Sequence, residues 1–151
     1  MNGRAMCWIA IALAVSWGVA WAMKGGSSPE KVCSLAFSNG YRLERVPVAT
    51  TKAQQAHGLS GRASPGKGML FDFGQPERLA FWMKDTHFPL SIGFFDGQGR
   101  LIRSEDMEAD SEHYHLSLDP ARFALELPKG SYQAHQVKPG VAMKVENCTN
   151  F

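Results

Sequence analysis

The chain has 151 residues, of which 44% are hydrophobic, and it carries 16 basic and 14 acidic residues. This length and apolar content fit one domain with a real hydrophobic core. The two signs of charge are interspersed, so the sequence offers no concentrated basic face for nucleic acid and no support for a role at a membrane surface.

The first 22 residues have the form of a signal peptide for export. Arg4 makes the start positive, residues 5–19 are uncharged, and Ala20-Trp21-Ala22 has the small-x-small pattern found before a cleavage point. Cleavage before Met23 leaves 129 residues and lowers the formal net charge from +2 to +1, because Arg4 is the only charged residue removed. An uncleaved membrane anchor is the alternative, because the uncharged stretch just reaches the length of a spanning helix. Both alternatives place the domain outside the cytoplasm.

Residues 23–30 are expected to be a flexible lead-in, and a single β-rich domain is expected over residues 31–151. The first two strands, 32–38 and 41–49, flank Asn39-Gly40, a dipeptide typical of a type I′ hairpin turn. Within the second strand the apolar phase shifts, which predicts a bulge near Glu44 and Arg45. Pro47 has no N–H for a sheet ladder, so this strand is expected at a sheet edge.

A short helix and a loop follow the hairpin. Thr51-Lys-Ala-Gln54 fits a capping box, in which the hydroxyl and the amide side chain satisfy free N–H groups at the start of a helix. The helix is expected to end near Gly58. Residues 60–68 hold three glycines and a proline and therefore predict a loop.

Apolar runs of strand length then alternate with turn residues as far as the C-terminus. They cover residues 69–73, 79–83, 90–95, 100–104, 123–127 and 141–146, and one more helical turn is expected within 131–137. About eight short strands with one or two short helices predict a mainly β fold, a single β-sandwich or barrel-like domain. Nothing suggests a parallel nucleotide-binding sheet, and no cofactor is expected.

Two cysteines follow the signal, near opposite ends of the expected domain. A disulfide between Cys33 and Cys148 suits an exported protein and requires the first and last strands to be neighbours. Two unrelated buried thiols are the alternative.

Several blocks resemble one known family. They are Gly58-Leu59 with Arg62, Gly68-Met69-Leu70-Phe71, Phe81-Trp82-Met83-Lys84-Asp85-Thr86, Pro89-Leu90, Asp96-Gly97-x-Gly99-Arg100, and Pro120 to Leu127 with Gly130. With these blocks, residues 43–146 resemble the domain-of-unknown-function family number 192. The resemblance implies a compact β-rich domain behind an export signal, and the periplasm as its location. A membrane-anchored domain that faces outward is the alternative, with membrane contact only through residues 5–22.

Two positions depart from the pattern of that family. It usually has Asn where this chain has Asp85, and Asp where this chain has Ser91. The first change replaces an amide by a carboxylate, which only accepts hydrogen bonds, and the second removes a carboxylate. A role that needed both groups together is therefore in doubt.

Residues 81–89 are the best candidate for a binding site. Alternation along a strand places Trp82 and Lys84 on the opposite side from Phe81 and Met83. Trp82 could then lie beside Lys84 in a cleft, with polar contacts from Asp85 and Thr86, as suits a sugar or another small polar ligand or envelope component. The alternative is that Trp82 packs in the core, Lys84 is solvated, and Asp85 and Thr86 form a turn.

Arg62 and Glu126 need partners if they are buried. They could pair with each other, or with Lys84 and Asp85. In a functional arrangement, Arg62 and Lys84 would together receive a carboxylate or phosphate of the ligand.

An acidic stretch from 105 to 115 includes two histidines that suggest a metal. His113 and His115 would share a face if the chain is extended there, with His135 as a possible third ligand. A solvated acidic loop is the alternative.

The sequence therefore predicts an exported binding or accessory module of the cell envelope, with its pocket near Trp82, Lys84 and Asp85. A hydrolase acting through Asp85 or Glu126 is one alternative, which a pocket with one carboxylate of strongly raised pKa would favour. A metal-binding protein using the histidines is the other. No Gly-x-Ser-x-Gly elbow supports nucleophilic catalysis, and no catalytic residue is assigned.

Overall fold

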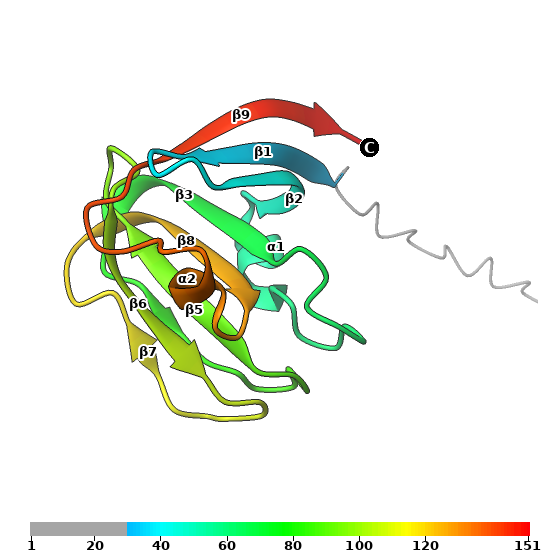
Figure 1. The fold of residues 1–151 in the computed structure, drawn as a ribbon. Coiled ribbons are helices and arrows are strands. Elements are labelled where there is room, and N and C mark those ends of the chain that lie inside the picture. The colour runs from blue at the N-terminus through cyan, green and yellow to red at the C-terminus, as the bar shows by residue number, and fades with distance from the viewer. Residues whose placement is uncertain (1–29) are drawn as a thin grey trace, which may run out of the picture.

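The computed structural model describes residues 30–151 (Figure 1). The expected signal peptide, residues 1–22, and residues 23–29 of the lead-in lie outside the described residues. Neither helix within residues 30–151 is long and apolar enough to cross a membrane.

Nine strands and two short helices make up the fold. The strands are β1 Lys31–Phe37, β2 Arg42–Ala49, β3 Met69–Glu77, β4 Ala80–Phe81, β5 Leu90–Phe95, β6 Leu101–Met107, β7 His115–Leu116, β8 Ala121–Pro128 and β9 Met143–Asn150, and the helices are α1 Lys52–His57 and α2 Ser131–Ala134. The predicted mainly β fold is confirmed. β7 was not expected, because its two residues are too short to leave an alternating pattern.

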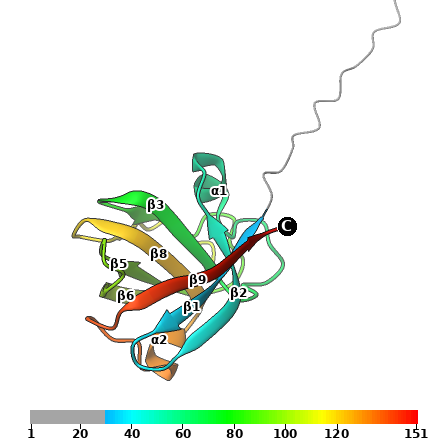
Figure 2. The same cartoon turned by 90° about the horizontal axis from the view of Figure 1, so that it is seen from above.

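Seven strands form one open sheet in the order β6-β5-β8-β3-β2-β1-β9, and β4 pairs with β7. All neighbours are antiparallel except β2 and β3. Figure 2 shows the curvature of the sheet from β6 and β5 round to β1 and β9. At one end its two edges touch, because Arg100, next to β6, bridges Ala142, next to β9. The sheet is therefore barrel-like without being closed.

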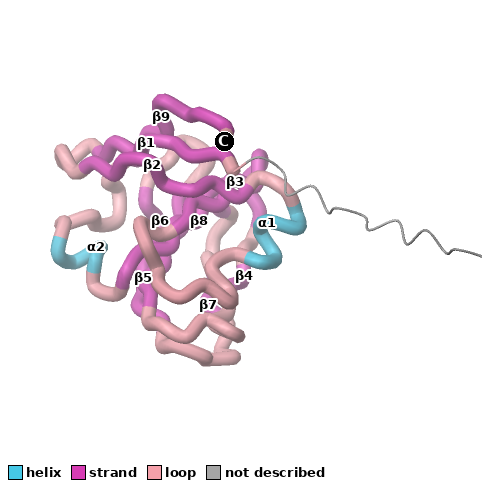
Figure 3. The backbone as a smooth tube through the Cα atoms, turned by 90° about the vertical axis from the view of Figure 1, so that its right-hand side faces the viewer, coloured by secondary structure: helices cyan, strands magenta, loops and turns pink. Residues whose placement is uncertain are grey.

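The two faces of the sheet carry separate apolar clusters. Along β8, Leu125 and Leu127 point into one cluster, and Ala124 points into the other. On the first face α2 places Tyr132 against Gly93, where a Cβ would come within 2.4 Å of the tyrosine oxygen. Helix α1 lies on the other side of the molecule from α2 (Figure 3). The second cluster is covered by the chain that runs through β4.

The first hairpin is confirmed, with a different turn from the one expected. The Gly40 N–H donates to the carbonyl of Phe37, and only Gly40 of the Asn-Gly pair has a positive φ, 91°. A type I turn followed by one left-handed residue gives this longer loop. The predicted bulge is also confirmed: the register jumps from Val46 to Leu43, and Arg45 has a φ of 56°.

The expectation that Pro47 marks an edge strand is wrong. Strand β2 lies inside the sheet, between β1 and β3. The proline is tolerated because the pairing with β3 begins only at Val48. At Pro47 the backbone is paired with β1 alone, so no ladder hydrogen bond is lost on the other side.

The two ends of the described chain are joined as expected. Strands β1 and β9 are antiparallel neighbours, and Cys33 and Cys148 form a disulfide. Cys148 lies where the register between these strands shifts, next to Asn147 with a φ of 48°. This shift in register places Cys148 against the buried Cys33.

Candidate functional site

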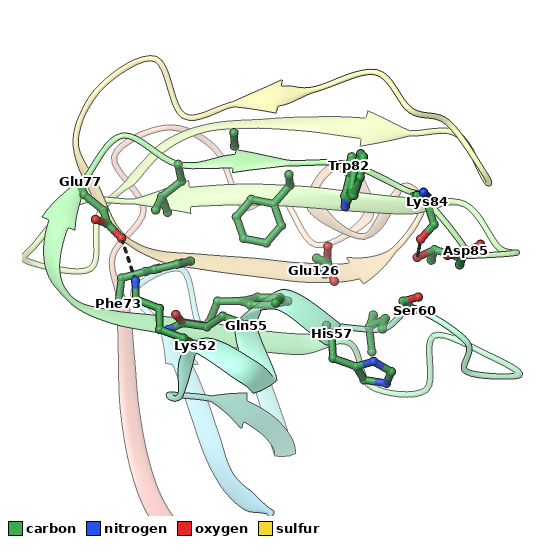
Figure 4. Close-up of a pocket in the computed structure, with 18 of the residues that line it drawn as sticks. Lys52, Gln55, His57, Ser60, Phe73, Glu77, Trp82, Lys84, Asp85 and Glu126 are labelled. Carbon is green, nitrogen blue, oxygen red and sulfur yellow. Dashed lines mark hydrogen bonds and ion pairs between the residues drawn. The ribbon is translucent and has the colours of Figure 1, made fainter.

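A cavity of about 640 Å³ lies between α1, the sheet and the chain from Glu77 to Thr86 (Figure 4). Its walls include Lys52, Gln55, Ala56, His57, Leu59, Ser60, Phe71, Phe73, Glu77, Arg78, Leu79, Ala80, Phe81, Trp82, Lys84, Asp85, Thr86 and Glu126. This size and the mixture of aromatic and polar groups are typical of small-molecule sites.

Helix α1 forms one wall of the cavity. Its capping box is present as predicted, with the Thr51 hydroxyl accepting from the Gln54 N–H and the Gln54 amide oxygen accepting from the Thr51 N–H. The Gln55 amide donates to the backbone carbonyl of Asp72 at 2.9 Å and ties the helix to β3. Lys52 lies 3.9 Å from Glu77 across the cavity. The cap therefore fixes the position of side chains that line the site.

The glycine-rich loop before β3 packs closely against the strand that carries Glu126. Gly68 has a φ of 82°, and a Cβ on it would lie 2.0 Å from the backbone oxygen of Glu126. Only glycine fits this approach and this backbone conformation. The loop thus packs directly against the backbone of Glu126.

Glu126 is the most unusual group in the cavity. Only 5% of the residue is exposed, and Figure 4 shows its carboxyl directed into the space between α1 and Trp82. Within residues 30–151, no hydrogen bond or ion pair reaches this carboxyl. Burial disfavours its charged form and raises the pKa of Glu126 to about 8. At neutral pH it is mostly a neutral acid, able to donate one hydrogen bond.

Aromatic rings form the other wall. Phe81 packs edge-on against Phe71, with ring centroids 4.9 Å apart, and against Phe73 at 6.3 Å. Trp82 is 44% exposed and stacks on Tyr114, with centroids 5.8 Å apart. The Lys84 ammonium lies 5.4 Å from the centre of the Trp82 ring. Trp82 is therefore at the rim beside Lys84, and it is not part of the core.

A tight turn ends this wall. The Thr86 N–H donates to the carbonyl of Met83 at 3.0 Å, and Asp85 has a φ of 56°. The Asp85 carbonyl accepts from the Gly61 N–H at 2.8 Å, which fixes the turn against the glycine-rich loop. Asp tolerates this left-handed conformation less readily than Gly but better than most residues. The expected turn at Asp85 and Thr86 is present, and both residues still line the cavity.

Five of the six residues predicted as ligand contacts line this one cavity: Trp82, Lys84, Asp85, Thr86 and Glu126. Arg62 does not. Its guanidinium lies 3.6 Å from Glu30, and both side chains are exposed. A pairing of Arg62 with Glu126, Lys84 or Asp85 was expected only if Arg62 were buried, and it does not form, because Arg62 is exposed and lies beside Glu30.

The histidines do not gather into one site. His115 is buried and its ring lies 5.5 Å from that of His113, while His135 stacks on Tyr41 at 3.9 Å. His115 Nδ1 is 3.4 Å from a carboxylate oxygen of Glu105, outside hydrogen-bond geometry. In the described part of the chain, no group of three or more His, Cys, Asp or Glu side chains is placed to hold a metal ion.

Ser91 lies on the opposite face of the sheet from the cavity, beside a smaller one of about 230 Å³. Its hydroxyl accepts from the Gly130 N–H at 2.8 Å and donates to Asp106, its cross-strand neighbour. A carboxylate from the adjacent strand therefore lies next to position 91. Asp85 and Ser91, the two positions expected to differ from the family pattern, line different cavities.

Several lining residues were not predicted, namely Lys52, Gln55, Phe73 and Glu77. The capping box indicated a helix at the right place, but nothing in the sequence indicates which strand that helix faces. The polar and apolar faces of such a short helix are too small to show this.

The profile of the DUF192 family, described as uncharacterized ACR, matches residues 35–145. A crystal structure from Sinorhizobium meliloti 1021, provisionally described as a transcription regulator, is similar over 80% of this chain and 98% of that chain, with 31% identity and a TM-score of 0.71. A protein of unknown function from Novosphingobium aromaticivorans DSM 12444 is similar over 75% of this chain and 83% of that chain, with 27% identity and a TM-score of 0.67. No curated protein matches the chain.

Proposed function

Because this chain belongs to the DUF192 family, which is described only as uncharacterized, we propose its function from its own cavity: it is an exported binding module that holds a small polar ligand at Glu126. The observation that carries the proposal is a buried carboxyl, without a protein partner, directed into a cavity of about 640 Å³. The carboxyl oxygens face the cavity, so a ligand can reach them. Burial disfavours the charged form of this group, and a ligand that pairs with it would offset that cost.

The location outside the cytoplasm is part of the proposal. It rests on the charge and the small-x-small pattern of residues 1–22, and a disulfide such as Cys33–Cys148 suits an oxidising compartment. We propose the periplasm as that compartment. This chain has 16 basic and 14 acidic residues that are interspersed, and it therefore lacks the concentrated basic face that a DNA-binding regulator needs.

Native mass spectrometry of the protein recovered from its own cell envelope tests the proposal. We expect a mass that shows cleavage before Met23 and a small adduct on the protein. In Ala56→Phe, a ring enters the cavity from α1, and the adduct should be lost. Ala53→Phe adds the same ring to an exposed position of α1 that does not line the cavity, and it should keep the adduct. Wild-type protein without an adduct, or equal adducts in both variants, would refute binding at this cavity.

A hydrolase is the second candidate, and the raised pKa of Glu126 favours it. A carboxyl that is protonated near pH 7 can act as a general acid. The second carboxylate of such a mechanism would be Asp85, which lines the same cavity. Glu126→Gln tests the hydrolase, because the variant lacks the catalytic acid. If the protein is a hydrolase, the variant should carry an intact substrate from the envelope as its adduct, whereas the wild type should cleave that substrate.

A further inference from the structure

We propose that the cavity takes a small organic cation, with its ammonium group against the Glu126 carboxylate and its carbon skeleton against the rings of Phe71, Phe73 and Phe81. This inference rests on the function proposed above and specifies the ligand class. It is carried by two features of the cavity, the lone carboxyl at the floor and the arrangement of ammonium groups over the aromatic rings.

The first feature is the isolation of the carboxyl. Glu126 is 95% buried, since 5% of it is exposed, and it has no hydrogen-bond or salt-bridge partner within residues 30–151. The surrounding side chains of this face are apolar, among them Met69, Ile92 and Phe71. The carboxyl oxygens are open only to the cavity, and an ammonium group there would form a charge-assisted hydrogen bond, which is stronger than a neutral one.

The second feature is that the cavity's own rings already hold ammonium groups. Lys52 Nζ lies 5.9 Å from the centre of the Phe73 ring, and Lys84 Nζ lies 5.4 Å from that of Trp82. Both distances are within the range of cation–π attraction. Phe73 and Trp82 therefore each have a ring face that attracts positive charge, while Phe71 and Phe81 pack edge-on and would contact the carbon skeleton of the ligand.

An anionic ligand fits less well. Of the basic side chains that line the cavity, Lys52 lies 3.9 Å from Glu77, while Lys84 lies over Trp82 at the rim, away from the floor. At the floor, a ligand carboxylate would meet the carboxyl of Glu126. Two acidic groups in one buried site cannot both ionise without a large energetic cost.

Cation binding should be accompanied by release of a proton. Free Glu126 has its pKa raised to about 8 by burial, so at pH 7 most molecules carry the proton that the cation must replace. We therefore expect release of about one proton per ligand at pH 7 and almost none at pH 9.5. A neutral ligand that accepts a hydrogen bond from the protonated acid would release none.

Two matched pairs of probes test the inference on the full-length chain by isothermal titration calorimetry at pH 7. Choline is compared with 3,3-dimethyl-1-butanol, its uncharged isostere, and phenethylamine with 2-phenylethanol. At least one cation should bind at least about tenfold more tightly than its neutral partner, and Glu126→Gln should remove that preference. Glu108→Gln makes the same change on the exposed side chain that pairs with Lys129, and it should keep the preference. Proton release, followed in a pH-stat, provides a check on the wild type alone.

The outcomes separate this inference from the proposed function. Equal binding of the cationic and neutral probes, binding without proton release, or no binding of either cation would overturn the cation assignment. The first two would still leave a cavity that binds small molecules. The proposed function is judged independently, by the envelope adduct and its loss in Ala56→Phe.

Discussion

Burial of Glu126 makes the stability of the fold depend on pH. In the unfolded chain its pKa is near the ordinary value of 4.5, and in the folded protein it is about 8. Between these values the folded state holds one more proton than the unfolded state, so the free energy of unfolding falls as pH rises. Below pH 4.5 the titration of Glu126 does not lower the free energy of unfolding, and above pH 8 the decrease is complete.

Glu126→Gln removes this titration while keeping the shape of the side chain. Relative to the wild type, we expect the variant to gain free energy of unfolding as pH rises from 5 to 8.5, by at most about 4 kcal/mol. Urea denaturation of both proteins at several pH values measures the gain. A constant difference between the two proteins across this range would show that Glu126 has an ordinary pKa in the folded state.

At the scale of single residues, the sequence was informative where an unusual residue stood in a clear pattern. Glu126 stood out because a carboxylate interrupts an apolar strand, and the structure places it at the cavity floor. Arg62 had no such pattern. It lies in a loop whose path is set by Gly68 and by the bond from Gly61 to Asp85. Because these are contacts between distant segments, the partner of Arg62 could not be predicted.

Among the elements, α1 has little support of its own. It has six residues, and none of them is buried, so it depends on its cap and on the bond from Gln55 to β3. An isolated helix of this length is not stable in water. The wall that it provides for the cavity is therefore sensitive to changes at Thr51.

We expect Thr51→Ala to lower the free energy of unfolding by about 1 kcal/mol, because the Gln54 N–H loses its acceptor. Thr50→Ala is the matched control: Thr50 uses only its backbone N–H in the cap, and its change should cost less than half as much. Urea denaturation measures both. Hydrogen exchange should show faster exchange in α1 for Thr51→Ala alone, and equal effects of the two variants would contradict the role of the hydroxyl.

Strand positions were predicted better than strand partners. Alternation and turn residues located β5 to the residue and the first hairpin to within a residue. The prediction of an edge strand from Pro47 was wrong because the pairing of β2 with β3 covers only two positions and begins after the proline. Such partial pairing depends on where β3 enters the sheet, which local sequence does not encode.

At the scale of the whole molecule, the disulfide between Cys33 and Cys148 spans 115 positions of the chain. A bond that closes so long a loop restricts the unfolded chain strongly, by about 4 to 5 kcal/mol in the chain-entropy account. The fold does not rest on this bond alone, since β1 and β9 also share a ladder of backbone hydrogen bonds.

The double variant Cys33→Ala, Cys148→Ser should therefore remain folded and lose about 4 kcal/mol of unfolding free energy. Urea denaturation in the presence and absence of dithiothreitol measures this loss. The reductant should destabilise the wild type once it unfolds and should not affect the variant. Identical midpoints for the wild type and the variant without reductant would mean that the two thiols are not joined.

Strand β1 lies between β2 and β9, so its two edges are paired at different stages of synthesis. As the chain is synthesised, β1 can pair with β2 early, but its other edge stays open until residues 143–150 are available. An open strand edge is a template for pairing with other chains. A chain that is truncated before Met143 should therefore self-associate through β1, with the Cys33 thiol still unpaired. The last strand thus protects the first half of the chain from aggregation.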